Sequence, residues 1–253
     1  MPELVEVADR VWVARYAAHD VNVTVVGGER GALVVDTRES EQAGRELLED
    51  LRRLGLVTVT AVACTHDHFD HVGGNGALAA AYPGLEVVAH EDAAVPGVTR
   101  TFSSVHVLDL GDRAVELFHP GRAHTSGDLV VRVPDADVLV AGDLVEEATP
   151  PWYGEDSWPM EWPVALDLVL GLVSPGTVVV PGHGAPVDRD FVERQRADVG
   201  TVAETLRDLV GRGVPEADAL AAATWPFPPE HVAAAVPRAY AQLPRAQKLL
   251  PLV

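Results

Sequence analysis

Cysteine and lysine are almost absent from this sequence of 253 residues. Its one cysteine, Cys64, excludes an intrachain disulfide framework and any metal site made of several thiolates. All basic residues except Lys248 are arginine, so covalent chemistry on a lysine is not expected. No apolar run approaches the roughly 20 residues that span a bilayer, and no secretory signal is visible at the beginning. These absences predict a cytoplasmic protein that does not bind membranes.

Positive charge is also scarce, because 19 basic residues face 38 acidic ones and the formal net charge is −19. Such a surface repels phosphate backbones and anionic membranes, which argues against a general nucleic-acid binder. Hydrophobic residues make up 47% and charged residues 23%, as in ordinary folded proteins. No long linker interrupts the chain. We therefore predict one domain over residues 1–253, with a helical part at 190–253 packed on it and offering a face for a homodimer.

The two halves of the chain repeat one order of elements. Each half has an apolar strand that ends at an aspartate, then a helix, then a second strand that ends near a histidine. The expected elements are 32–35, 40–54 and 56–64 in the first half, and 137–141, roughly 160–173 and 177–180 in the second. A hairpin of the β-rich runs 11–15 and 21–26 precedes them. Two such repeats predict one α/β domain with two sheets.

Three histidines and an aspartate gather where the strand 56–64 ends, at His66, His68, Asp70 and His71. His66 and His68 are two residues apart, so on an extended strand end they project to the same side. Asp70 and His71 follow where glycines turn the chain into the next helix. Clustered imidazoles repel one another when protonated but are stabilised around a cation. Imidazole nitrogen and carboxylate oxygen suit zinc, iron or manganese, so a metal site is predicted here.

The segment 66–71 resembles the metal-binding signature of the metallo-β-lactamase fold superfamily. Four other segments resemble further motifs of that family and stand in its order along the chain. They are the strand end at Asp36, His124-Thr125-Ser126-Gly127-Asp128, Ala141-Gly142-Asp143, and Pro181-Gly182-His183-Gly184. The resemblance covers roughly residues 5–190. It implies an α/β fold, a four-layer αββα sandwich in which two mixed β-sheets are flanked by helices.

Carried over residue by residue, the resemblance implies two divalent metal ions, most readily Zn²⁺, with iron or manganese as alternatives. The first ion would be held by His66, His68 and His124, the second by Asp70, His71 and His183, and Asp143 would bridge them. Asp36 and Asp128 would hold the ligand loops by hydrogen bonds. The ions would share a hydroxide that attacks the substrate, with Asp70 and Asp143 as the catalytic carboxylates.

Four aromatic or imidazole side chains are candidates for substrate contact. Tyr16 and His19 lie in the first hairpin, whose loop often overhangs the active site in the family that the sequence resembles. Trp152 and Tyr153 follow soon after Asp143, and aromatic residues beside a metal site often wall an apolar pocket. Nearby candidates are assigned structural roles: Glu155 and Asp156 as a solvated pair, Ser157 as the cap of the next helix, and Trp162 as a core residue.

The favoured function is a metal-dependent hydrolase that cleaves a small-molecule ester, lactone or thioester. The alternative is a mononuclear iron dioxygenase acting on a thiol or persulfide, because such enzymes share the motifs and hold one iron with two histidines and one aspartate. Hydrolysis of β-lactams is less favoured, because true β-lactamases usually carry cysteine or serine where this chain has Asp143. A binding protein without activity would have lost ligand residues, and this sequence retains them all.

Overall fold

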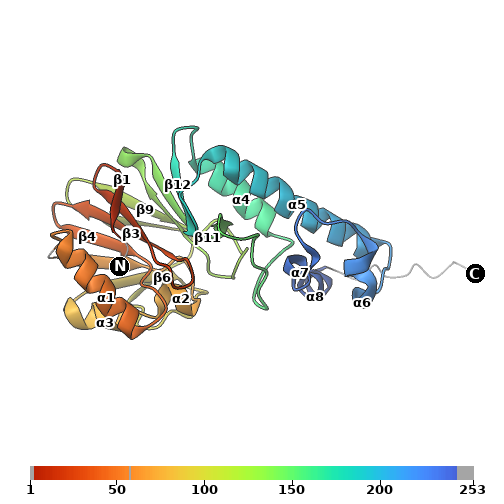
Figure 1. Ribbon diagram of the computed structural model, residues 1–253, viewed down its shortest axis with the longest axis horizontal. Helices are drawn as coiled ribbons and strands as arrows, with labels where there is room; N and C mark the ends of the chain where they lie inside the picture. The colour runs from red at the N-terminus through yellow and green to blue at the C-terminus, as the bar shows by residue number, and fades with distance from the viewer. Residues whose placement is uncertain (1–2, 57, 244–253) are drawn as a thin grey trace, which may run out of the picture.

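Two mixed β-sheets form the centre of the computed structural model, which describes residues 3–56 and 58–243 (Figure 1). The first sheet has seven strands in the order β1-β2-β3-β4-β5-β6-β7. They are β1 (Val5–Ala8), β2 (Val11–Arg15), β3 (Asn22–Gly28), β4 (Gly31–Val35), β5 (Val59–Ala63), β6 (Glu86–His90) and β7 (Arg100–Phe102). Pairing is antiparallel from β1 to β4 and parallel from β4 to β7. The hairpin predicted from residues 11–26 is the pair β2 and β3.

The second sheet has five strands in the order β12-β11-β10-β9-β8. They are β8 (Val105–Asp109), β9 (Ala114–Phe118), β10 (Val130–Val133), β11 (Val138–Glu146) and β12 (Val178–His183). The strands β11 and β12 are parallel, and the other pairs are antiparallel. All nine residues of β11, which pairs with β12 and β10, are buried, so Asp143 lies deep in the molecule.

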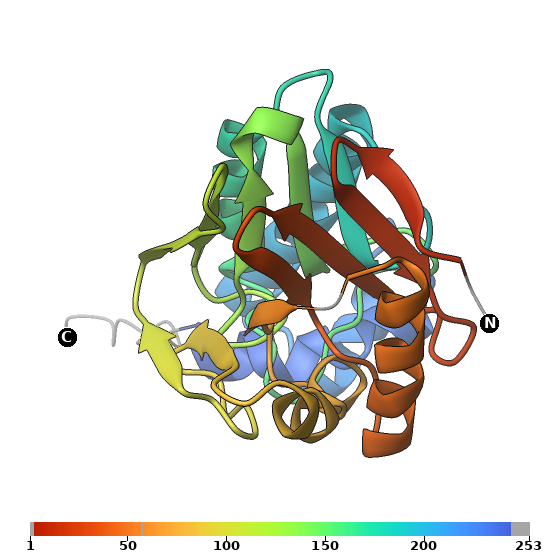
Figure 2. The same cartoon turned by 90° about the vertical axis from the view of Figure 1, so that its left-hand side faces the viewer.

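Helices cover the outer faces of both sheets (Figures 1 and 2). The described helices are α1 (Glu41–Arg53), α2 (Phe69–Val72), α3 (Asn75–Ala81), α4 (Trp162–Leu172), α5 (Arg189–Gly211), α6 (Glu216–Ala219), α7 (Pro229–Val232) and α8 (Ala235–Gln242), with short 3₁₀ turns at Pro134–Ala136 and Leu220–Ala222. The two long helices α1 and α5 begin after a side chain that accepts a backbone N–H. Ser40 Oγ accepts from Ala43 and Asp188 Oδ1 accepts from Phe191, at 3.1 and 2.9 Å.

Alternate residues of the buried strands face different cores. On β4, Ala32 and Val34 belong to the core beneath α1 and α3, while Leu33 and Val35 belong to the core between the sheets. The strand β11 divides its residues in the same way between that central core and the one beneath α4 and α5. Burial on both faces explains why the stretches 32–35 and 138–141 of these strands are continuous apolar runs in the sequence. Three cores separate four layers, so the predicted αββα sandwich is confirmed.

The segment before α4 differs from the prediction. The helix begins at Trp162 rather than near residue 160, and Glu161, not Ser157, precedes its first turn. Ser157 instead donates its hydroxyl to the carbonyl of Gly154 at 2.8 Å and closes a turn within the loop. Pro163 occupies the first turn, where its missing N–H costs no hydrogen bond. The loop before α4 is therefore longer than the sequence pattern suggests.

The helices after residue 188 extend beyond the sheets. The helix α5 packs along α4, and α6 and α8 pack against its far part, to the right in Figure 1. Residues 244–253, which include Lys248, lie outside the described residues, so the predicted extent of the domain over 1–253 stays a prediction, as does the homodimer. Within the described ranges, no helix is both long and apolar enough to cross a membrane. The cytoplasmic location stays a prediction.

Cys64 is fully buried at the end of β5, and burial raises the pKa of its thiol above the usual range. We expect the native protein not to react with a thiol reagent such as dithionitrobenzoate at pH 8. In denaturant, we expect the same reagent to release one equivalent of thionitrobenzoate per chain. Rapid labelling of the native protein would contradict this burial. The interpretation of Cys64 as a buried small hydrophobic residue is confirmed by its 0% exposure.

Candidate metal centre

The predicted ligands converge at one edge of the sandwich, where strands of both sheets end. His66, His68, Asp70 and His71 follow β5 and enter α2, His124 lies in the loop after β9, Asp143 lies on β11, and His183 ends β12. The strand β12 passes very close to this part of β11. A side chain at Gly182 would collide with the carboxylate of Asp143, so glycine is required at that position.

One group consists of His66, His68, His124 and Asp143, whose ligand atoms all lie within 4.8 Å of one another. His124 Nε2 is 2.9 Å from His68 Nδ1 and 3.4 Å from Asp143 Oδ2, and His66 Nε2 is 3.7 Å from the same oxygen. Nitrogen ligands of a tetrahedral zinc ion lie about 3.4 Å apart, given bonds of about 2.0–2.1 Å. The spacing of these four side chains therefore fits a metal ion.

A second group adjoins the first and consists of Asp70, His71 and His183. His183 Nε2 lies 3.3 Å from His71 Nε2 and 3.6 Å from Asp70 Oδ2. Asp143 lies beside this group as well, with its two oxygens 3.2 Å from His71 Nε2 and 3.3 Å from His183 Nε2. The carboxylate of Asp143 thus contacts ligand atoms of both groups.

Three of the five histidines are oriented by side-chain partners on the nitrogen that faces away from the centre. His71 Nδ1 donates to Asp36 at 2.8 Å. Thr65 donates its hydroxyl to Asp36, so its oxygen accepts the proton of His66 Nδ1 at 3.1 Å. His68 donates from Nε2 to Asp156 at 3.0 Å. A proton fixed on the outer nitrogen leaves the inner nitrogen with a free lone pair, which is the state a metal ligand requires.

Backbone carbonyls orient the remaining two histidines. His124 Nδ1 donates to the carbonyl of Trp152 at 3.1 Å, and His183 Nδ1 donates to that of His19 at 2.7 Å. His19 and Asp20 both have positive φ, near 59°, in the turn between β2 and β3. This backbone is costly for residues other than glycine, and here it presents a carbonyl to a predicted ligand.

Burial governs the electrostatics of the centre. It lowers the pKa of His66 well below its ordinary value and that of His124 to about 4. Burial also acts to lower the pKa of His71, but the carboxylates of Asp143 and Asp36 outweigh it and raise that pKa well above normal. For Asp143, burial favours the neutral acid, yet His71 and His66 hold the pKa well below its usual range. A metal cation would replace the proton of His71 and keep Asp143 ionised.

An unpaired atom supports the same interpretation. Among the described residues, His66 Nε2 is buried and has no hydrogen-bond partner. A buried nitrogen without a partner costs free energy, and native structures rarely leave one. Its position within the group of His68, His124 and Asp143 makes a metal ion the partner that fits. The donor set therefore suits zinc, iron or manganese.

The two aspartates predicted to support the ligand loops lie beneath the centre. Asp36 accepts from both the N–H and the hydroxyl of Thr65, each at 2.8 Å, and from His71. Asp128 accepts from the N–H and the hydroxyl of Thr125 at 2.9 and 2.7 Å and so closes the turn that follows His124. Burial raises the pKa of Asp128 to about 7 despite these hydrogen bonds. Asp36 thus contacts the predicted ligand His71 directly, whereas Asp128 contacts Thr125, the neighbour of the predicted ligand His124.

The cavity above the centre has a volume of about 620 Å³. It is lined by His19, Asp20, His68, Phe69, Asp70, His124, Asp143, Glu146, Ala148, Thr149, Trp152 and His183. The predicted pocket residues His19 and Trp152 are among them. A cavity of this size accommodates a small organic substrate beside the ligand residues.

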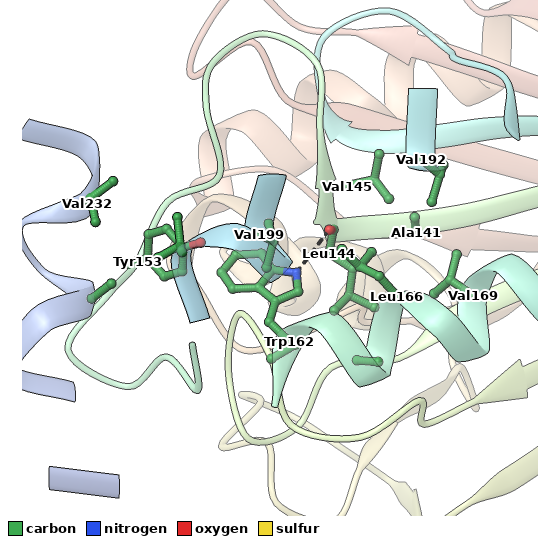
Figure 3. Packing of buried hydrophobic residues seen from close by; sticks show 14 of the residues in the cluster. Ala141, Leu144, Val145, Tyr153, Trp162, Leu166, Val169, Val192, Val199 and Val232 are labelled. Carbon is green, nitrogen blue, oxygen red and sulfur yellow. Dashed lines mark hydrogen bonds between the residues drawn. The ribbon is translucent and has the colours of Figure 1, made fainter. Parts of the chain in front are cut away.

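The other two predicted pocket residues do not line this cavity. Tyr16 is 2% exposed in the core beneath α1, where its hydroxyl donates to Asp50 at 2.6 Å. Tyr153 is 1% exposed and packs on Trp162 with ring centres 5.2 Å apart (Figure 3). Neighbouring residues of an extended segment point to opposite sides, so an exposed Trp152 leaves Tyr153 facing inward. The expectation that Tyr16 and Tyr153 wall the pocket is wrong.

Two acidic residues near the centre were not predicted to belong to it. Glu146 is buried beside Asp143 and His183, and burial together with the Asp143 carboxylate raises its pKa well above normal. An irregular pairing between β11 and β12 brings Glu146 to the same side as Asp143, which a regular strand would not do. Asp156 contacts His68 and is therefore not merely a solvated residue. The only sequence signal for Glu146 and Asp156 is that both follow the Asp143 motif along the chain.

Asp156 offers a test of ligand orientation. We expect Asp156→Ala to weaken zinc binding by about 10- to 100-fold, because His68 loses the carboxylate that fixes its ring. The measurement is a titration against a fluorescent chelator. Glu155→Ala is the matched control, since Glu155 is also exposed and its side chain makes no hydrogen bond to the described part of the chain. Equal affinity in both variants would contradict the orienting role.

Fold and ligand cluster define the chain as an αββα sandwich with a metal centre at the ends of its strands. The family model of the metallo-beta-lactamase superfamily matches residues 17–214, and the chain belongs to this superfamily of metal-dependent hydrolases. It is 30% identical over 182 residues to a metallo-beta-lactamase type 2 from Bacillus cereus, covering 68% of this chain and 70% of the relative. The predicted family membership is confirmed.

Two further similar proteins are a hydrolase and a solved metallo-beta-lactamase structure. A hydroxyacylglutathione hydrolase from Gloeobacter violaceus is 40% identical over 119 residues, which are 46% of this chain and 44% of that protein. A solved metallo-beta-lactamase from Pontibacter korlensis aligns with a TM-score of 0.69 at 25% identity, covering 79% of this chain and 99% of the other. The family match ends at residue 214, so α6, α7 and α8 lie beyond it.

Proposed function

We propose that the chain hydrolyses a small-molecule ester, lactone or thioester with two divalent ions, most readily zinc, held by the seven clustered ligand residues. The observation that carries this proposal is the position of Asp143, whose oxygens lie 3.2–3.7 Å from ligand nitrogens of both groups. A single carboxylate shared by two sets of imidazole donors suits a pair of cations. When bound, such ions lower the pKa of a water molecule to about 7 and polarise a carbonyl oxygen.

Asp70 is the candidate for moving the proton. Its carboxylate lines the cavity, and Oδ2 lies 3.6 Å from His183 Nε2 and 3.9 Å from His71 Nε2. From this position Asp70 can accept the proton of the attacking water and later donate it to the leaving group. The carbonyl of His19 and the carboxylate of Asp36 hold the two histidines beside it in place. Such fixed groups need little reorganisation during the reaction.

The relatives support cleavage of a carbonyl compound by water. The hydrolase from Gloeobacter violaceus is named for a thioester, which favours thioesters among the candidate substrates. The relative from Bacillus cereus is named a metallo-beta-lactamase, but this chain carries Asp143 where we expect a cysteine or serine in β-lactamases. Hydrolysis of β-lactams is therefore the less favoured activity.

The test combines metal analysis with a substrate panel. Protein loaded with zinc, manganese or iron is assayed against aryl esters, lactones, thioesters and β-lactams, and oxygen uptake is followed with a persulfide. We expect close to two ions per chain and hydrolysis that a chelator abolishes and zinc restores. Turnover that survives complete metal removal would contradict the proposal. One iron per chain with oxygen uptake would favour the dioxygenase, and preferred cleavage of β-lactams would favour a lactamase.

A further inference from the structure

The cavity above the ligand cluster has an aromatic rim. Phe69 and Trp152 are 61% and 60% exposed, and both line the cavity. The ring of His19 stands edge-on to Phe69, with centres 5.2 Å apart. Large apolar side chains this exposed beside a functional centre are typical of a surface that a ligand covers. The rim therefore favours an apolar or aromatic group in the substrate.

The same cavity lacks cations. No lysine or arginine occurs among the described residues that line it. Asp20, one of the lining residues, is bound by Arg15 through two contacts of 2.5 and 2.6 Å, so the charge of this arginine is already compensated. An anionic group on the remote part of a substrate would find no lysine or arginine on these described walls to offset the loss of its hydration.

Positive charge at the ligand cluster would not compensate an anionic group on the remote part of the substrate. Metal ions there would act on the reacting carbonyl and on the oxygen that develops negative charge. A carboxylate several bonds away would instead face the aromatic rim, on a protein whose formal net charge is −19. Recognition of a charged substrate requires opposite charge on the protein at the corresponding place.

We infer, on the basis of the proposed function, that the substrate is an uncharged ester, lactone or thioester whose remote part is apolar or aromatic. The cavity selects against substrates that carry a carboxylate on that part. A glutathione thioester, which has two carboxylates in its peptide, is disfavoured on this ground. The chain therefore differs in substrate class from the relative named for hydroxyacylglutathione, although the ligand residues suit the same type of reaction.

The inference is tested first by binding, which does not depend on turnover. Benzyl mercaptan and 4-(mercaptomethyl)benzoate both bind metal through sulfur and differ by one carboxylate. We expect the metal-loaded full chain to bind the uncharged thiol at least about tenfold more tightly in calorimetry. Equal binding, or tighter binding of the carboxylate, would overturn the inference.

A variant pair tests whether the charge of the wall causes the preference. Thr149 is exposed on the cavity wall, and Thr149→Arg adds a cation there, while Thr149→Gln adds similar length without charge. We expect only the arginine variant to shift the affinity ratio toward the carboxylate thiol, by about tenfold. An identical ratio in both variants would show that wall charge does not control selection and would overturn the inference.

Matched substrates separate this inference from the proposed function. The pair is methyl 4-acetoxybenzoate, which is uncharged, and 4-acetoxybenzoate, which carries a carboxylate. Hydrolysis of both esters with equal kcat/KM would contradict the inference and leave the proposed function standing. Absence of hydrolysis together with the thiol preference would contradict the proposed function and leave the selectivity of the cavity standing.

Discussion

Asp143→Asn is expected to remove most of the proposed hydrolytic activity and at least one of the two proposed ions. The amide keeps the shape of the carboxylate but loses its charge and turns an N–H₂ group toward imidazole nitrogens 3.2–3.7 Å away. Loss of an ion removes several kcal/mol of transition-state stabilisation, or about two to three orders of magnitude in kcat. Metal content by plasma emission spectroscopy and kcat on the same preparation provide the measurement.

The matched control for this prediction is Asp50→Asn. Asp50 is also a buried aspartate, but it lies on α1 and accepts from Tyr16, remote from the ligand residues. We expect this variant to lose stability while keeping its full metal content. Two ions and unchanged turnover in the Asp143 variant would show that this carboxylate is not shared between the groups. Metal loss in both variants would indicate general unfolding instead.

The strands that carry the centre could be predicted because the apolar pattern that marks each of them lies within its own short stretch of sequence. The residues of β4 and β5 are apolar except for Thr60, since both faces of the first sheet are largely buried, and polar residues of the centre follow each strand. In the second sheet, β11 and β12 begin as apolar runs, while Asp143 lies within β11 and His183 is the last residue of β12. The ligand residues were predicted from the motifs and the family resemblance, and the structure brings all seven side chains together within two adjoining groups.

The orientation of residues in the loop before α4 could not be predicted, because it depends on distant parts of the chain. The carbonyl of Ser157 accepts from Arg238 Nε at 2.8 Å and from Gln242 Nε2 at 3.0 Å, both on α8. These contacts span more than 80 residues of sequence. They hold the loop so that Asp156 reaches His68 and Tyr153 turns into the core. Local patterns carry no information about such contacts.

Trp162 connects this loop, the second sheet and the metal centre, and its replacement is expected to cause the largest loss of stability. The side chain is fully buried, and its indole N–H donates to the carbonyl of Leu144 at 3.2 Å (Figure 3). Its ring also lies 5.2 Å from that of Tyr153 and 5.7 Å from that of His124, centre to centre. The prediction that Trp162 is a core residue is confirmed, and α4 begins at this residue.

We expect Trp162→Ala to lower the free energy of unfolding by about 3–5 kcal/mol, because it leaves a large cavity beneath β11. The melting temperature should fall by roughly 10 °C for a chain of this size, measured by calorimetry at a fixed excess of zinc, since bound metal itself shifts the transition. Trp162→Phe keeps most of the ring volume and loses the hydrogen bond to Leu144, so a loss of about 1–2 kcal/mol is expected. This difference would show that packing of the indole, more than its hydrogen bond, holds the loop and His124 against the second sheet. Equal stability of the alanine and phenylalanine variants would contradict that conclusion.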